Sequence, residues 1–156
     1  MRTLLVSKRS FWAGALAGAL VLAVGAVLLP PVPVAAQDAG TLFINLTAGT
    51  EQPHRPTMAF KMAIDARAAG KQAVIFLNID APMLATTRYP ETLQFGSQSV
   101  RALMAQARDA GVQFFVCPHC MAAKGITADD LIDGTQVSDS DTLWAALEGP
   151  VVSMSY

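Results

Sequence analysis

Beyond residue 40, short apolar runs alternate with segments that mix apolar and polar residues at helical spacing. Three runs, residues 41–47, 73–79 and 112–116, are rich in β-branched and aromatic side chains, which favour strands. A fourth run, residues 151–154, predicts an edge strand. Because the first three runs are almost continuously apolar, we expect strands buried on both faces, as in a parallel sheet.

Three helices are predicted between these strands. The first, residues 57–69, ends at Gly70, a residue that commonly follows a helix. The second, residues 98–110, carries apolar side chains at the spacing i, i+3, i+4 and i+7, which places them on one face. The third, residues 141–147, is expected to turn its apolar side chains inward. These inward positions are Val100, Leu103, Met104 and Ala107 in the second helix, and Leu143, Ala146 and Leu147 in the third.

The alternation of strands and helices predicts a three-layer α/β fold with a mostly parallel sheet of about five strands. Right-handed crossovers place the helices of such a fold on the faces of the sheet. Ligands then bind beyond the carboxyl ends of the strands. Three connections lie at that end: residues 49–56, residues 80–96 and the segment that starts at Cys117. The second is long for its type, and such loops are commonly functional.

The first 36 residues read as an export signal. Arg2, Lys8 and Arg9 precede an uninterrupted apolar run over residues 11–29, and small residues stand before Gln37. This pattern predicts a signal peptide of residues 1–36, cleaved after Ala36, followed by one domain of residues 37–156. The alternative is a retained membrane tether through residues 11–29, because nineteen apolar residues are just long enough to cross a bilayer. Both readings place the domain outside the cytoplasm, which in a bacterium means the periplasm.

Charge and cysteine content argue against two classes of protein: nucleic-acid-binding proteins and disulfide-built scaffolds. The chain has 11 basic and 12 acidic residues, and three of the basic ones lie in the first 36 positions. The remaining domain therefore carries eight basic against twelve acidic groups and offers no basic surface for nucleic acid. Two cysteines are too few for a disulfide-built scaffold.

Both cysteines occur in the sequence Cys117-Pro118-His119-Cys120, directly after the third predicted strand. Proline suits the first turn of a helix, so we expect Cys117 at the N-cap, facing unpaired N–H groups. These groups and a neighbouring His119 imidazolium would favour the thiolate. Cys120, one turn further on, is placed to resolve a sulfenate, persulfide or mixed disulfide on Cys117. The alternatives are an incidental pair and an inert disulfide.

Other uses of the cysteines meet specific obstacles. Covalent haem attachment requires a histidine after the second cysteine, and Met121 stands there. A structural zinc site needs four ligands, for which His54 and His119 are the only soft candidates beyond the cysteines. Cys117, Cys120 and Met121 would suit Cu(I), so a soft-metal site stays open as an alternative. The same tetrapeptide occurs in oxidising thioredoxin-fold proteins, but here two βα units precede it and Gly125 ends the helix early.

From about residue 41 to the C-terminus, the chain resembles the DsrE/TusD-like sulfur-trafficking family, which includes members described as predicted peroxiredoxins. Five stretches, taken in order and spacing, support the resemblance. They are LFINL at 42–46, AAGKQAV at 68–74, GVQFFVC at 111–117, GIT and DLIDG between 125 and 134, and LW at 143–144.

The resemblance implies a flavodoxin-like domain that forms a homotrimer or hexamer and carries sulfur as a persulfide on a loop cysteine. That cysteine corresponds best to Cys117, with Cys120 as the alternative. Sulfur donor and acceptor proteins, or small sulfur compounds, would be the partners, and no cofactor is expected. Two departures stand out: the familiar carriers are cytoplasmic, and they commonly use one loop cysteine.

Further residues are assigned from their loops. His54 and Arg55 would bind an anionic sulfur compound or a partner carboxylate, or else are simply solvated. Arg88 and Tyr89 in the long loop would line the same cleft, and Trp144 is read as core or subunit interface. The leading hypothesis is an exported sulfur carrier or sulfurtransferase that acts through Cys117, with Cys120 and His119 in support. A thiol–disulfide oxidoreductase and a non-enzymatic soft-metal or oligomeric interaction module are the alternatives.

Overall fold

The computed structural model describes residues 40–156. The predicted signal peptide, its cleavage site and the tether at residues 11–29 lie outside the described residues. Within the part that is described, no helix has the length and hydropathy needed to cross a membrane.

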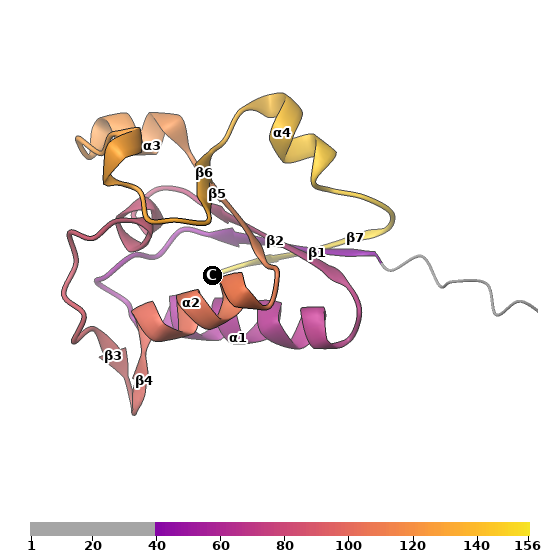
Figure 1. Cartoon of the computed structure of the whole chain (residues 1–156), viewed down its shortest axis with the longest axis horizontal. Helices are drawn as coiled ribbons and strands as arrows, with labels where there is room; N and C mark the ends of the chain where they lie inside the picture. Colours follow the sequence, from indigo (N-terminus) through magenta and orange to yellow (C-terminus); the bar gives the residue numbers. More distant parts are fainter. Residues whose placement is uncertain (1–39) are drawn as a thin grey trace, which may run out of the picture. The chain divides into compact units, whose positions relative to one another are not determined.

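A five-stranded parallel sheet forms the centre of the domain, in the order β6-β5-β2-β1-β7 (Figure 1). Its strands are β1 (Thr41–Leu46), β2 (Gln72–Leu77), β5 (Gln113–Val116), β6 (Thr135–Val137) and β7 (Val151–Ser155). The four predicted strands are therefore present, and β7 is the edge strand that was expected. β6 is too short and too polar to stand out in the sequence.

The helices occupy both faces of this sheet, which confirms the predicted α/β class. α1 (His54–Ala68) and α2 (Val100–Asp109) lie side by side on one face, and α4 (Ser140–Ala145) lies on the other (Figure 1). α3 (Pro118–Ala123) follows β5 at the carboxyl ends of the strands. The site predicted from the sequence is thus at the end of the sheet where α/β proteins bind ligands.

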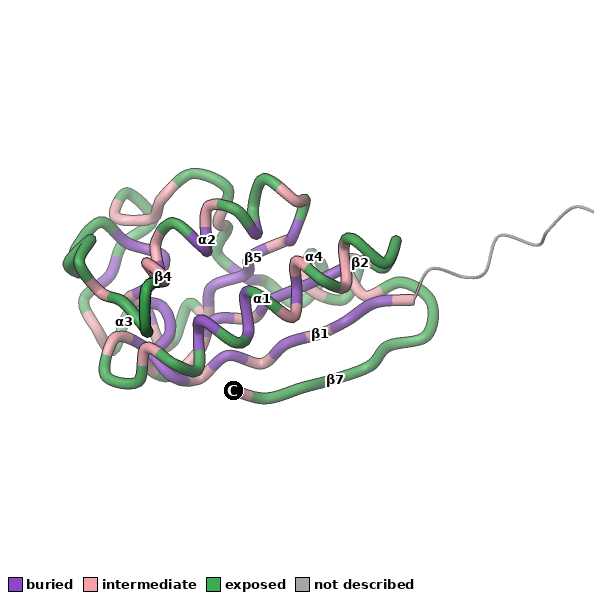
Figure 2. The backbone as a smooth tube through the Cα atoms, turned by 90° about the horizontal axis from the view of Figure 1, so that it is seen from below, coloured by how far each residue is buried: buried purple, intermediate pink, exposed green. Residues whose placement is uncertain are grey.

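The hydrophobic core lies between the sheet and the pair α1–α2. Strand residues of alternate positions point into it, because successive side chains of a strand face opposite sides. Phe60 of α1 meets Phe114 of β5 edge-on, with 5.8 Å between ring centroids. The central strands are largely buried, whereas β7 is exposed along its length (Figure 2). The four inward positions predicted for the second helix are all buried.

α1 begins three residues earlier than predicted, at His54 rather than Thr57. The sequence pattern was broken by Pro56, but a proline in the first turn loses no helical hydrogen bond, because the N–H groups there have no partner within the helix. His54 and Arg55 therefore belong to the first turn of a helix and not to a loop.

The long connection after β2 is more ordered than its composition indicated. It contains a 3₁₀ helix, Ala81–Ala85, and a hairpin of β3 (Gln94–Phe95) and β4 (Gln98–Ser99). A second 3₁₀ helix, Ala128–Asp130, follows α3. An antiparallel bridge between Thr86 and Leu131 joins the two segments. The long loop is thereby fixed against the chain that follows the cysteines.

α4 covers its face of the sheet only loosely. None of its residues is buried, and Leu143, Ala146 and Leu147 are half-buried rather than inward. Trp144 is 69% exposed, so it is not a core residue, and its interpretation as an interface residue stays a prediction.

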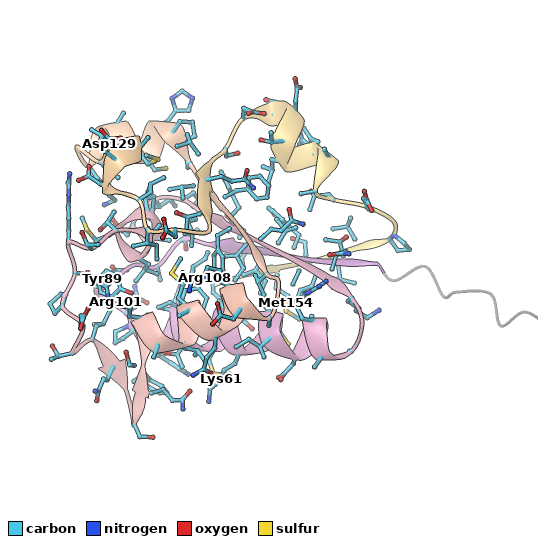
Figure 3. The ribbon with its side chains drawn as sticks, viewed as in Figure 1. Lys61, Tyr89, Arg101, Arg108, Asp129 and Met154 are labelled. Carbon is cyan, nitrogen blue, oxygen red and sulfur yellow. The ribbon has the colours of Figure 1, made fainter. Side chains whose placement is uncertain are left out.

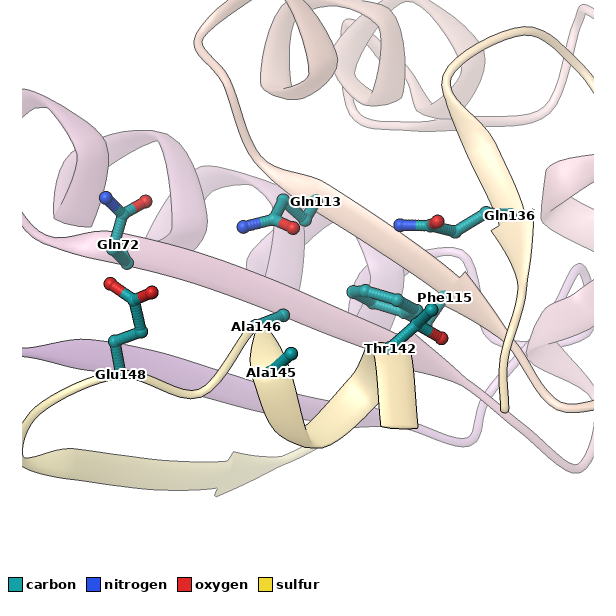
Figure 4. A pocket seen from close by; sticks show the side chains of 8 residues that line it. All are labelled: Gln72, Gln113, Phe115, Gln136, Thr142, Ala145, Ala146 and Glu148. Atoms are coloured by element: carbon teal, nitrogen blue, oxygen red, sulfur yellow. The ribbon is translucent and has the colours of Figure 1, made fainter. Parts of the chain in front are cut away.

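A polar pocket of about 420 Å³ separates α4 from the sheet (Figure 4). Here α4 presents small alanines to the glutamines of β2, β5 and β6. The lining residues are Gln72, Gln113, Phe115, Gln136, Thr142, Ala145, Ala146 and Glu148.

Candidate functional site

The connections that leave β5 and β6 run to opposite faces of the sheet. After α3, the chain passes along α2, where the Arg108 guanidinium donates to the Asp133 carbonyl at 3.2 Å and Ile132 packs against the core. The connection after β6 instead forms α4 on the other face (Figure 1). Ligand sites of open α/β sheets form where neighbouring connections diverge in this way. Cys117, the residue directly after β5, stands at this point.

Cys117 is the N-cap of α3, as the sequence predicts. Its backbone is extended, and its Sγ accepts a hydrogen bond from the Cys120 N–H at 3.4 Å. Pro118 occupies the first helical position, where its missing N–H is not needed. The Cys117 N–H donates to the Leu77 carbonyl at 2.9 Å, which ties the residue to the end of β2. These hydrogen bonds thus fix Cys117 at the carboxyl end of the sheet.

Cys120 lies one turn along the helix and is also a free, half-buried thiol. Its Sγ accepts a hydrogen bond from the Ile79 N–H at 3.1 Å. Burial raises the pKa of the Cys120 thiol above its ordinary value, and a hydrogen bond shared with the Cys117 side chain raises it further. The Ile79 N–H and the positive charge of Lys124 oppose this rise. On balance the pKa of the Cys120 thiol lies above its ordinary value.

An ion pair links the end of α3 to the turn that follows β2. The Lys124 Nζ lies 2.5 Å from the Asp80 Oδ1, across 44 positions of sequence. Beside it, the Asn78 Nδ2 donates to the Asn45 Oδ1 at 2.5 Å and links the ends of β2 and β1. These contacts hold the segment after β2 against the helix that carries the cysteines.

The other residues of the tetrapeptide and its flank are less engaged. His119 is exposed, and it makes no hydrogen bond or ion pair among the described residues. Met121 is only 4% exposed and belongs to the core. Residues 40–156 contain no group of three or more histidine, cysteine or acidic side chains that could hold a metal ion.

The predicted anion-binding residues lie in separate contacts. The His54 ring stacks on Phe95 of the hairpin, 4.2 Å between centroids, and Arg55 is exposed in the same helical turn. The Arg88 guanidinium forms a two-point contact with Asp130, at 2.6 and 3.2 Å, and donates to the Gly125 carbonyl at 2.9 Å. Arg88 thus connects the long loop to the segment that follows α3.

Tyr89 does not line an open cleft. It is 4% exposed, and the Arg101 guanidinium lies over its ring at 4.2 Å (Figure 3). Burial raises the pKa of the Tyr89 phenol, and the Arg101 charge partly opposes this effect. The expectation that Tyr89 lines a ligand cleft is therefore wrong: its side chain packs the long loop against Arg101 of α2.

Three residues of the site have no signal in the sequence: Ile79, Asp80 and Lys124. An isoleucine that ends an apolar run reads as strand, but β2 ends at Leu77 and Ile79 lies in the following turn. The Asp80–Lys124 pair joins two positions far apart in the chain. Only a tertiary structure brings such residues together.

The fold and the site define an α/β protein with an N-capping cysteine and a second thiol at the carboxyl end of a parallel sheet. A model of the DsrE/DsrF-like family matches residues 41–148, and the chain belongs to this family. Among solved structures, the chain is similar to the ychN protein from E. coli, with a TM-score of 0.59 and 17% identity over 74% of this chain and 98% of that one. This likeness shows the fold. A search of curated proteins finds no significant match.

Proposed function

We propose that the protein carries sulfane sulfur as a persulfide on Cys117, with Cys120 as the second thiol. The observation that supports this most directly is the paired geometry. One sulfur caps a helix at the end of β5, and the other lies one helical turn further on, where it accepts a hydrogen bond from the Ile79 N–H. Membership of the DsrE/DsrF-like family and the resemblance to sulfur-trafficking proteins support the same chemistry.

Loading is a thiol exchange that needs no external oxidant. The Cys117 thiolate attacks the outer sulfur of a donor persulfide, R–S–SH. A bond forms between Cys117 Sγ and that sulfur, the donor's S–S bond breaks, and R–S⁻ leaves. Transfer to an acceptor thiolate repeats the exchange and restores the Cys117 thiolate. At the N-cap, the Cys120 N–H donates to the Cys117 Sγ, and the positive end of the α3 dipole faces the same residue.

Cys120 provides a second way to discharge the persulfide. When its thiolate attacks the Cys117 Sγ, the Cys117–Cys120 disulfide forms and hydrosulfide leaves. A dithiol reductant must then restore the two thiols. Burial and the Cys117 side chain raise the pKa of the Cys120 thiol, and a raised pKa slows this discharge, so a loaded persulfide survives long enough to be transferred.

The setting of this activity is part of the proposal. The apolar leader predicts export, so the domain would work in the periplasm, either freed by cleavage after Ala36 or tethered through residues 11–29. A homotrimer or hexamer is proposed as the working assembly, and the 69% exposure of Trp144 supports a subunit contact there. The partners would be sulfur donors and acceptors of protein or small-molecule type.

A thiol–disulfide oxidoreductase is the second candidate, because two free thiols one helical turn apart can exchange with the disulfide of a substrate. In that case Cys117 attacks a substrate disulfide, forms a mixed disulfide and is released by Cys120. No extra sulfur atom would remain on the protein at any stage of this cycle.

The intact mass of the exported protein distinguishes these functions. Thiols are trapped by alkylation before lysis, and the mass is read before and after reduction for the wild type, Cys117→Ser and Cys120→Ser. We expect one or more extra sulfur atoms in the wild type and in Cys120→Ser, and none in Cys117→Ser.

A plain disulfide in the wild type, with mixed disulfides trapped in Cys120→Ser, would instead identify an oxidoreductase. The same spectra give the first residue of the mature chain. A start at Gln37 identifies a cleaved signal, whereas retention of residues 1–36 identifies a tether.

A further inference from the structure

Ile79 has an unusual backbone conformation. Its φ is +54°, and it is the one non-glycine residue with positive φ between residues 40 and 156. The Ala81 N–H donates to the Asn78 carbonyl at 3.0 Å, which closes a turn around Ile79 and Asp80. The φ values of these two residues, +54° and −97°, have the signs of a type II′ turn. The first central position of that turn is normally glycine, and a β-branched residue there is an outlier.

Core packing does not explain the isoleucine. Its side chain is 58% exposed, so its contribution to burial is small. Strained residues of this kind persist where the surrounding structure fixes them, and they gather at functional sites. At Ile79 the contact that coincides with the strain is the hydrogen bond from its N–H to the Cys120 Sγ.

The surroundings fix this turn from three sides. The Asn78 and Asp80 N–H groups donate to the Leu46 and Thr47 carbonyls, each at 3.0 Å, which ties both neighbours of Ile79 to the end of β1. The Asp80 carboxylate is paired with Lys124 of the α3 terminus. Gly49 permits the close approach, because a Cβ there would lie 2.5 Å from the Asp80 carbonyl oxygen.

We infer that Ile79 is a positioning residue, whose left-handed backbone aims its N–H at the Cys120 Sγ and holds that sulfur beside Cys117. The inference rests on the proposed function for its meaning, since it assigns the turn after β2 a part in discharging the persulfide. The isoleucine side chain is not required for this role, because the backbone N–H makes the contact.

The consequence for the chemistry concerns the charge on Cys120. For discharge, Cys120 gives its proton to water, its thiolate attacks the Cys117 Sγ, and hydrosulfide leaves. The Ile79 N–H stabilises the thiolate before the attack, and it stabilises the same thiolate as a leaving group when the disulfide is reduced. The other titratable or charged groups around this sulfur are Cys117 at the start of α3, Lys124 at its end and Asp80 after β2.

Amide NMR of the reduced full-length chain tests the contact. The Ile79 amide is followed by hydrogen exchange and by its chemical shift against pH in the wild type, Cys120→Ala and Cys117→Ala. Loss of one hydrogen bond predicts exchange about fivefold to tenfold faster in Cys120→Ala, and a much smaller change in Cys117→Ala. In the wild type the amide shift should follow the same midpoint as alkylation of Cys120. Unchanged exchange in Cys120→Ala, or a shift that follows Cys117 alone, would overturn the inference.

Two backbone variants test the positioning. Gly49→Ala introduces the clash with the Asp80 carbonyl and displaces the turn, so we expect the pH midpoint of Cys120 alkylation to rise while that of Cys117 moves less. Ile79→Gly is the matched control: it keeps the N–H, removes the side chain and should leave the Cys120 midpoint as in the wild type. A folded Gly49→Ala protein with an unchanged midpoint would refute the role, as would a large shift in Ile79→Gly. If Gly49→Ala fails to fold, the NMR comparison decides.

These measurements use thiols only and no sulfur donor. If they succeed while the intact mass shows no added sulfur, the positioning role holds and sulfur carriage is the part that fails. If sulfur is carried but the amide does not respond to Cys120, this inference alone is lost.

Discussion

Replacing an isoleucine by glycine should cost little stability at one position and much at another, although the two lie only four residues apart. Ile75 lies in the middle of β2 and is fully buried, whereas Ile79 lies in the turn after β2 and is 58% exposed. We predict that Ile79→Gly changes the free energy of unfolding by less than about 1 kcal/mol, because three effects nearly cancel.

The first effect is stabilising: a residue held in a sparsely populated backbone region costs of order 1–3 kcal/mol, and glycine removes that cost. The second is the greater freedom of glycine in the unfolded chain, about 0.5–1 kcal/mol against folding. The third is lost burial. With 58% exposure, Ile79 forfeits less than half of the roughly 1.5–3 kcal/mol that full burial provides. At Ile75 no strain is relieved, and the cavity and the glycine together should cost about 3–6 kcal/mol.

Urea unfolding of the full-length chain, followed by circular dichroism with the thiols kept reduced, measures both changes. The Ile75→Gly protein should show a large fall in midpoint or no cooperative transition, whereas the Ile79→Gly protein should unfold close to the wild type. A loss of more than about 2 kcal/mol in Ile79→Gly would refute the reasoning, because the turn would then hold no strain to release.

Three further predictions concern the thiols, the loop contact and a helix cap. The pKa of Cys120 should fall in Cys117→Ala, because the protonated Cys120 thiol loses the hydrogen bond that it donates to the Cys117 side chain, and alkylation rates against pH measure this change. Arg88→Gln should raise the pKa of Asp130 from about 2 toward its ordinary value, since Arg88 is the main cause of the depression, and carboxylate NMR measures it. The Asp130 contribution to stability is therefore present above the ordinary carboxylate range and lost as pH falls toward 2. Ser99→Ala should destabilise the protein by about 1 kcal/mol, because the Ser99 side chain caps α2 by accepting from the Ala102 N–H.

Each of these predictions has a clear contrary result. A higher Cys120 midpoint in Cys117→Ala would mean that Cys117 does not raise the Cys120 pKa. An Asp130 titration unchanged in Arg88→Gln would show that the two-point contact does not form in solution. For the cap, Ser97→Ala at the exposed hairpin tip is the control, and equal losses in the two variants would refute the capping role.

The layered fold could be read from local pattern alone. Residues 41–47, 73–79 and 112–116 are apolar runs of strand length, and the i, i+3, i+4, i+7 spacing from Val100 to Ala107 places one helix face on the core. These patterns are strong because every position of an element that faces the core must carry an apolar residue. α4 was misjudged for the same reason: its apolar residues predict burial, but small alanines and facing glutamines leave a pocket instead.

In the candidate site, too, the local sequence predicts one feature and only the tertiary structure decides another. The position of Cys117 at a helix N-cap is a local matter of one proline following a strand, and the order of residues 116–120 was enough to predict it. The partner of Cys120 was decided by the fold, because the Ile79 N–H lies 41 positions away and reaches the sulfur only when β2 and β5 pair. Backbone N–H groups carry no signature in a sequence, so which sulfur one of them faces depends on how the strands are assembled.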